Sequence, residues 1–502
     1  MNHAMNDAMN DELNVRDGIG KALEAMRAGR ADRAIELLEP LSRQSPRDAR
    51  VWQLLGFASR DEQRMPEAAQ AFAQAVQRHP KDAKSVLAHA QARYESGLPA
   101  AQLCRQALEL DPDNLAAIGG CAAALAAEDQ KRAAENLLVD TLARRPDWLE
   151  GHKALSALRW TAGDTEEFVR SYTAACRKLP QHVPLRLAWF RQVAQARNWP
   201  AALAIIEAGE RLCGAQPAFV MARLFIAAES GARAQAEALF EHTRDWRDEV
   251  RDLAWIRHCL RERRPAEAAD VALALTRTPS ARLAWPYLSL IWRLLEDPRA
   301  LWLDGSPPYA RAMEVDLTSA DLAEFAALLR RLHTARAPYI EQSVRGGTQT
   351  DRPLFFRAEP IVQRVRARLL DAIREYVAGL PPFVEGHPLL GTPRTQLLFS
   401  GSWSVRLLSQ GYNVAHTHPM GWISSAFYVS LPSTAQMGPA PAGWIRFGTP
   451  PPELGLDLPA YAQIEPRPGR LALFPSTLWH STVPFDDGER LVAAFDVRPP
   501  AY

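Results

Sequence analysis

The chain has 502 residues with 59 basic and 58 acidic side chains, so its net charge of +1 excludes bulk attraction to nucleic acid or an anionic membrane. Its composition, 47% hydrophobic and 23% charged, excludes wholesale disorder. No uncharged apolar run approaches the roughly 20 residues of a membrane span, and the polar, acidic segment 1–14 lacks a secretory pattern. We therefore expect a cytoplasmic protein with neither a nucleic-acid nor a membrane partner.

The cysteines limit the kind of metal site that the chain can hold. All five are widely spaced, none forms a CxxC pair, and all precede residue 260. This usage is typical of reduced, buried residues in helices. Any metal site in the C-terminal half must therefore do without thiolate ligands.

Prolines recur at an almost fixed interval in the first part of the chain. They stand at Pro46, Pro80, Pro112, Pro146 and Pro180, which gives spacings of 34, 32, 34 and 34 residues. A period of this size predicts an array of helical hairpins.

One repeat is complete between residues 52 and 80. Its characteristic positions are Trp52, Leu55, Gly56, Ala68, Phe72, Ala75 and Pro80. They resemble the tetratricopeptide repeat, in which small residues let two antiparallel helices approach closely and large residues fill the groove of the next repeat. The regular spacing ends after residue 180, but helical stretches such as 200–213 and 234–240 continue. We expect degenerate repeats as far as residue 300.

The sequence predicts four regions. These are a flexible N-terminus (1–14), a repeat array (15–300), a Gly- and Pro-rich linker (301–316) and a C-terminal domain (317–502) with flanking helices at its start. Thr318 and Asp321 form the pattern of a capping box for a helix of about fifteen residues. A second helix is expected from Pro360 to Gly379, since proline is favoured in a first helical turn.

Short β-rich segments follow, separated by Pro and Gly turns. The candidate strands are residues 395–408, 422–431, 443–447, 461–464, 470–474 and 489–497. Six short strands within about a hundred residues predict a jelly roll, that is, a double-stranded β-helix. The predicted fold class is therefore α+β and multidomain: an N-terminal α-solenoid of tetratricopeptide-like hairpins followed by a jelly-roll domain.

Three histidines in this β-rich region form a candidate metal site. His416 and His418 are two residues apart, so on a strand both imidazoles would share one face, and His480 could approach from a partner strand. Three neutral nitrogen ligands suit Fe(II), Zn(II), Mn(II) and Cu(II) about equally. The spacing alone therefore leaves the metal open.

Arg490 is the candidate anion-binding residue. It follows His480 by ten residues, after a turn containing Asp486 and Asp487, so it begins the next predicted strand and can face the same cavity. A planar guanidinium in an apolar pocket binds a carboxylate with two hydrogen bonds. The alternative is an exposed ion pair with Asp486 or Asp487.

This His-to-Arg spacing, preceded by the run GRLALFPS at 469–476, resembles the second half of the Fe(II)/2-oxoglutarate dioxygenase jelly roll. Over residues 338–498 the chain resembles, more narrowly, the 2OG-Fe(II) oxygenases that are often fused to tetratricopeptide repeats. The residues that carry this resemblance are Gln342, Ser343, Arg345, Gly347, Thr348, Gln349, Thr350, Trp403, His416, Thr417, His418, Pro419 and the run 422–428.

The resemblance implies a set of metal ligands, and at one of these positions the chain differs from most of the family. His416 matches the first ligand of the HxD/E motif, His480 the distal ligand, and Arg490 the residue that holds the far carboxylate of 2-oxoglutarate. His418 stands where most relatives have a carboxylate. Either three histidines bind the metal, or two bind it and another group completes the site; Asp496 is the nearest carboxylate on a predicted core strand.

The resemblance also implies an activity: hydroxylation with Fe(II), O₂ and 2-oxoglutarate as co-substrate, releasing succinate and CO₂. Tyr428 or Tyr412 is a candidate hydrogen-bond donor to the co-substrate carboxylate. Trp403, Trp422, Tyr428 and Trp479 are candidate aromatic walls that exclude water from the site.

The repeats indicate the partner, because repeat surfaces commonly bind extended peptides. We expect a protein or peptide substrate presented by the array. Two alternatives stay open: a scaffold whose jelly roll is degenerate and non-catalytic, and a three-histidine, cupin-like metalloenzyme that does not use 2-oxoglutarate. The missing carboxylate favours the scaffold, whereas the presence of both His480 and Arg490 argues against it.

Overall fold

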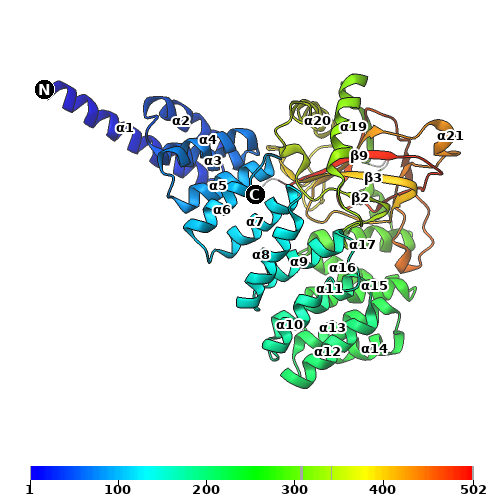
Figure 1. The fold of residues 1–502 in the computed structure, drawn as a ribbon. Helices are drawn as coiled ribbons and strands as arrows, with labels where there is room; N and C mark the ends of the chain where they lie inside the picture. Colours follow the sequence, from blue (N-terminus) through cyan, green and yellow to red (C-terminus); the bar gives the residue numbers. More distant parts are fainter. Residues whose placement is uncertain (1, 306–308, 341, 500–502) are drawn as a thin grey trace. The chain divides into compact units, whose positions relative to one another are not determined.

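The structure, a computed structural model, describes residues 2–305, 309–340 and 342–499. Helical hairpins occupy the described chain up to Asp304 (Figure 1). The helices of this part are α1 (Asn2–Arg27), α2 (Ala31–Gln44), α3 (Ala49–Asp61), α4 (Met65–Arg78), α5 (Ala83–Glu95), α6 (Ala101–Leu110), α7 (Leu115–Ala127), α8 (Lys131–Arg144), α9 (Leu149–Thr161), α10 (Arg170–Lys178), α11 (Val183–Gln195), α12 (Trp199–Cys213), α13 (Pro217–Ser230), α14 (Arg233–His242), α15 (Glu249–Arg261), α16 (Pro265–Leu275), α17 (Ala281–Leu294) and α18 (Arg299–Asp304).

The hairpin α3–α4 shows why the repeat pattern produces this fold. Asp48 begins α3 by accepting a hydrogen bond from a backbone N–H of the first turn, and Asp82 and Asn114 do the same for α5 and α7. Gly56 lets the two helices meet, because a Cβ there would lie 2.6 Å from the ring of the fully buried Phe72. The predicted α-solenoid is confirmed.

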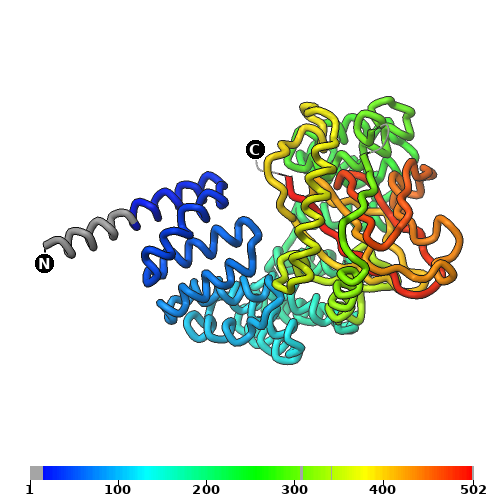
Figure 2. The backbone as a smooth tube through the Cα atoms, turned by 90° about the horizontal axis from the view of Figure 1, so that it is seen from above, coloured from blue at the N-terminus to red at the C-terminus, as the bar shows by residue number. Residues whose placement is uncertain are grey.

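The chain divides into two compact units. The first comprises Met1–Arg144 with Phe355–Gln363, and the second Arg145–Leu354 with Arg364–Tyr502. In the first unit, whose hairpins run from blue to cyan in Figure 2, the backbone N–H of Ala358 donates to Ser96 O (2.9 Å). The second unit thus joins the later repeats to the β domain.

The predicted region limits stay predictions. Helix α1 begins at Asn2, within the segment 1–14 that was expected to be flexible. Residue 1 of that segment and residues 306–308 of the predicted linker lie outside the described residues.

The β domain contains each strand expected after residue 395, and three more. Its elements are β1 (Arg311–Glu314), α19 (Ser319–Leu332), β2 (Val344–Gln349), η1 (Leu354–Phe356), α20 (Pro360–Ala378), β3 (Phe399–Asn413), β4 (Ile423–Ser430), α21 (Thr434–Met437), β5 (Ile445–Phe447), η2 (Pro452–Leu454), β6 (Ala462–Ile464), β7 (Arg470–Pro475), β8 (His480–Thr482) and β9 (Arg490–Val497). The predicted capping box of Thr318 and Asp321 starts α19. The sequence interpretation missed β1, β2 and β8.

The strands form two antiparallel sheets. One has the order β1-β7-β4-β9-β3-β2 and the other β6-β5-β8. Buried side chains of both sheets pack together, among them Ala426, Phe474 and Val492 of the larger sheet and Ile445 and Phe447 of the smaller. The C-terminal antiparallel β domain is thereby confirmed. The arrangement is compatible with the predicted jelly roll, whose topology stays a prediction.

The last repeats and the β domain share one hydrophobic core within the second unit. Leu454 and Trp479 of the β domain are buried in the cluster formed by helices α15 to α18. The indole N–H of Trp479 donates to Pro286 O of α17 (2.9 Å), and its ring meets the Tyr287 ring edge-on at 5.6 Å between centroids. Ala415 also packs against this cluster.

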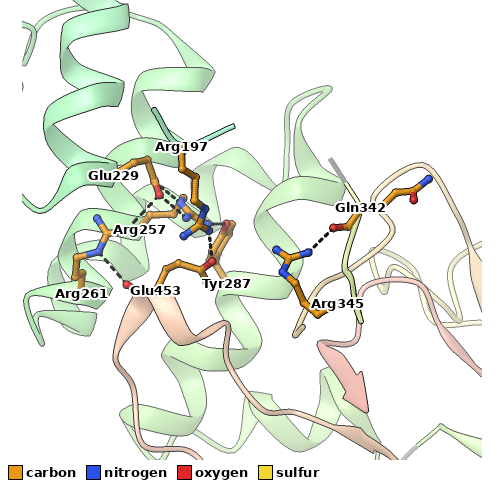
Figure 3. Close-up of polar contacts among 8 residues, drawn as sticks. All are labelled: Arg197, Glu229, Arg257, Arg261, Tyr287, Gln342, Arg345 and Glu453. Carbon is orange, nitrogen blue, oxygen red and sulfur yellow. Dashed lines mark hydrogen bonds and ion pairs between the residues drawn. The ribbon is translucent and has the colours of Figure 1, made fainter. Parts of the chain in front are cut away.

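Arginines of the repeats hold the segment that contains η2 (Figure 3). Arg197 pairs with the Glu453 carboxylate, and Arg261 donates from Nε to Glu453 O at 3.0 Å. Arg257 is fixed beside them by two hydrogen bonds to Glu229, at 2.7 and 2.8 Å. These contacts attach the β domain to the solenoid at a second place.

Candidate metal centre

The three candidate histidines converge although two of them do not lie on a strand. Strand β3 ends at Asn413, and His416 lies beyond it in an isolated bridge with His480, with backbone hydrogen bonds of 3.0 and 3.1 Å. The backbone N–H of His418 donates to Ser476 O (2.9 Å), just before the turn at Pro419. The expectation that His416 and His418 share a strand face is therefore wrong: two backbone bonds to His480 hold His416, and one to Ser476 holds His418.

The imidazoles are close enough for one ion. Their ring centroids are 4.1 Å apart for His416 and His480, 5.0 Å for His416 and His418, and 5.1 Å for His418 and His480. One ring nitrogen of each lies within 4.8 Å of the others. All three line a cavity of about 320 Å³ that also contains Arg490 and Asp496.

Every Nδ1 in the group already has a partner in the protein. Nδ1 of His416 contacts Val414 O at 2.8 Å, and Nδ1 of His480 contacts Leu478 O at 3.0 Å. Nδ1 of His418 lies 2.7 Å from Oδ2 of Asp496. Since carbonyl and carboxylate oxygens only accept, the neutral rings carry their proton on Nδ1 and leave Nε2 as the lone-pair nitrogen.

The environment keeps two of these rings uncharged at neutral pH. Burial, and then the neighbouring His418, lower the pKa of His416 to about 3. Burial, followed by His416 and His418, holds the pKa of His480 well below its ordinary value. Neutral imidazole is the metal-binding form. The donor set therefore fits a divalent metal ion.

Ser343 contacts the histidine group in a way that could not be read from the sequence. Its hydroxyl lies 3.2 Å from Nε2 of His416 and accepts a hydrogen bond from Nδ2 of Asn413 at 2.9 Å. It thus lies at the nitrogen of His416 that is free of a backbone partner. The only signal was its place in the block 342–350.

Arg490 is buried on the same cavity, and the expected alternative of an exposed ion pair is wrong. Its side chain is 2% exposed, and no acidic group pairs with it within the described part of the chain. Burial lowers the pKa of its guanidinium. The ring of Tyr428 lies against it, with its centroid 5.1 Å from the guanidinium carbon. A buried guanidinium without a counter-ion could accommodate an anion in the cavity.

The predicted aromatic residues fall into two groups, one that lines the cavity and one that does not. Trp403 lines the cavity, whereas Tyr412, Trp422, Tyr428 and Trp479 are absent from its lining. Trp422 instead donates to Leu389 O (2.9 Å), and Trp479 packs on the repeats as described above. The expectation that Trp422, Tyr428 and Trp479 form the cavity wall is therefore wrong. The roles of Tyr428 and Tyr412 toward a co-substrate stay predictions.

Comparison with known proteins agrees with this arrangement. Residues 401–496 match a family model described as "Putative 2OG-Fe(II) oxygenase", and residues 19–83 and 99–158 match models described as "Tetratricopeptide repeat". The chain therefore joins tetratricopeptide repeats to a domain of this oxygenase family. No curated protein matches it.

Similar solved structures are repeat proteins. A tetratricopeptide repeat protein from Parabacteroides merdae is 17% identical, with 48% of this chain and 97% of that one covered at a TM-score of 0.32. YrrB, "a TPR protein with an unusual peptide-binding site", is 15% identical, with 37% and 97% covered at 0.30. MamA from Desulfovibrio magneticus is 12% identical, with 34% and 97% covered at 0.31. At such TM-scores these likenesses carry no statement about activity or partner.

Among the described residues, no helix combines the length and the hydropathy that a membrane span requires.

Proposed function

We propose that the β domain is an Fe(II)- and 2-oxoglutarate-dependent oxygenase that hydroxylates a side chain of a protein or peptide substrate, releasing succinate and CO₂. One observation supports this most. Three imidazoles whose Nδ1 atoms are already bonded share a cavity with a buried arginine that has no acidic partner among the described residues.

His416, His418 and His480 would hold the iron through Nε2. The two backbone carbonyls and the Asp496 carboxylate fix their tautomers, so no proton has to leave Nε2 before the metal binds. Ser343 would exchange its contact with His416 for another partner when the metal arrives.

Arg490 would bind the far carboxylate of 2-oxoglutarate. Its charge is unpaired and desolvated, so a carboxylate in the cavity gains a charge-assisted bidentate pair at little cost in lost protein contacts. Tyr428 lies against the guanidinium, and burial raises the pKa of its phenol. Its hydroxyl therefore stays protonated beside the guanidinium.

Bound iron and 2-oxoglutarate together supply the activation of O₂. The protein's part is to limit water and to place the substrate. Apolar side chains of Ile445, Phe474 and Val492 line the cavity beside Arg490, and Trp403 stacks near His418 at 5.5 Å between ring centroids. Met420, 77% exposed, lies where the cavity lining reaches solvent and is a candidate contact for the substrate.

The test uses the full chain under anaerobic conditions, with Fe(II) added first and 2-oxoglutarate second. We expect a weak visible charge-transfer band of the chelated keto acid. Arg490→Ala should lose the band at moderate co-substrate concentration while still binding iron, and Arg467→Ala, an exposed arginine 60% accessible in its side chain, should keep it. Iron binding without any band contradicts the proposal and favours the cupin-like metalloenzyme. Failure to bind iron favours the scaffold.

We also propose that the repeats present the substrate, because tetratricopeptide arrays commonly bind extended peptides. Deleting residues 1–300 is unsuitable as a test, since it removes the helices whose core includes Trp479. Removing residues 1–144 leaves that core intact. We expect turnover of a protein substrate to fall while uncoupled 2-oxoglutarate turnover is retained; equal loss of both would contradict a role in presentation.

A further inference from the structure

We infer that Asp496 is a positioning residue that acts through His418 and supplies, across the imidazole ring from the metal, the negative charge that the three-histidine set lacks. The inference rests on the proposed metal site. It differs from direct ligation, because the carboxylate lies against Nδ1 of His418 and is not a member of the metal-binding group.

The three histidines differ in what holds their second nitrogen. His416 and His480 donate to neutral backbone carbonyls, whereas His418 faces a carboxylate at 2.7 Å. His418 is also the residue that occupies the place of the triad acid in the sequence motif. With a metal ion on Nε2, a neutral His418 and an ionised Asp496 would together bring the net charge of −1 that a ligating carboxylate would bring.

Hydrogen bonds hold the Asp496 carboxylate in this position. Oδ1 accepts a hydrogen bond from the Ser424 hydroxyl at 2.6 Å, and Ser424 in turn lies 2.8 Å from the Ser476 hydroxyl. Ser424 and Asp496 are register partners on β4 and β9. Gly421 lets the preceding loop lie over this network, since a Cβ there would be 2.4 Å from the Ser476 Oγ.

A nearby cation would also stabilise the buried carboxylate of Asp496. Its side chain is 11% exposed, and among the described residues it pairs with no lysine or arginine. Arg490 lies six residues away on the same strand, about 20 Å along it. Asp496 is the only acidic residue among the described residues that line the cavity. A buried carboxylate without a cationic partner is costly, and a divalent ion on the far side of His418 offsets that cost.

A positioning role and a structural role predict different effects of Asp496→Asn. If Asp496 only supports the fold, Asp496→Asn weakens the metal-free protein. If Asp496 serves the metal, Asp496→Asn reduces the affinity for the ion. The metal-free variant is then at least as stable as the wild type, because a buried charge has been removed. Loss of such an outer carboxylate typically weakens metal binding about 10- to 100-fold.

The experiment titrates the full metal-free chain with Co(II), a spectroscopic substitute for Fe(II), and records the ligand-field absorption and the melting temperature. We expect Asp496→Asn to bind Co(II) about 10- to 100-fold more weakly than the wild type, with an unchanged or higher melting temperature without metal. Asp487→Asn, on the turn before β9, is the matched control and should bind as the wild type does.

Three results would overturn the inference, each in its own way. Equal Co(II) affinity in Asp496→Asn and wild type would remove the role toward the metal. A lower melting temperature without metal, and no change in affinity, would make the role structural. X-ray absorption that shows a carboxylate oxygen replacing one imidazole would make Asp496 a ligand itself. A wild-type chain that binds no Co(II) would instead refute the proposed function.

Discussion

Trp479 connects the repeats to the strand that carries His480, so its removal perturbs both at once. The indole is 6% exposed and belongs to the core of helices α15 to α18. Its N–H donates to Pro286 O at 2.9 Å, and its ring meets that of Tyr287. We expect Trp479→Ala to loosen α17 and β8 together.

The expected magnitude follows from this burial. Truncating a buried tryptophan to alanine costs about 3–5 kcal/mol, which includes the cavity left behind. Since 1.4 kcal/mol is a factor of ten, a loss of about 3 kcal/mol raises the local opening equilibrium roughly 100-fold. Trp479→Phe keeps a buried aromatic ring but loses the N–H donor and three ring atoms, so it should cost less than the alanine change, about 1–2 kcal/mol.

Hydrogen exchange of the full, metal-free chain measures these openings segment by segment. Peptides from α17 and from β8 should both lose protection in Trp479→Ala, and peptides from α3 and α4 in the first unit should not change. If β8 alone loses protection while α17 exchanges as in the wild type, the two segments do not share a core and the reasoning fails.

Three further changes test other parts of the second unit. Arg490→Lys keeps the charge but loses the planar fork, so 2-oxoglutarate binding should weaken about tenfold or more by titration, and unchanged binding would contradict a bidentate contact. Burial raises the pKa of Asp304 to about 6, so the folded state holds its proton more tightly and loses stability as the pH rises from about 4 to 6. The stability of Asp304→Asn relative to the wild type should therefore rise by about 3 kcal/mol across that interval. The melting temperatures of the two proteins should diverge as the pH rises, and a constant difference between them would refute the pKa shift. Gly421→Ala should displace Ser476 and weaken Co(II) binding several-fold, whereas Gly120→Ala, with open space around its Cβ position, should not.

Much of the fold could be predicted because its causes are local. The proline period and small residues such as Gly56 specify hairpins, and the six predicted strands are bounded by Pro and Gly turns. The missed strands lack such signals. β8 has three residues, and β2 contains Gly346 and Gly347 with a register shift between its ladder positions. Their partners, and not their own composition, make them strands.

The site could be predicted only as a set of residue types. His416, His418, His480 and Arg490 were found from spacing and resemblance, and the structure brings all four to one cavity. The contact between His418 and Asp496 joins residues 78 positions apart and depends on the register of β4 and β9. Such register cannot be read from one sequence, because every long-range pair needs the folded sheet to define it.

The segments that carry His416 and His480 each place one residue against the repeats and the next residue in the cavity. Ala415 packs against the core of the last repeats, whereas the next residue, His416, lines the cavity. In the same way, Trp479 packs against that core and the next residue, His480, lines the cavity. Two of the three candidate ligands are therefore bonded directly to residues that touch the repeats. A metal ion held by these histidines would be a built-in reporter: binding of a partner to the last repeats would change the ion's spectrum, without any label on either protein.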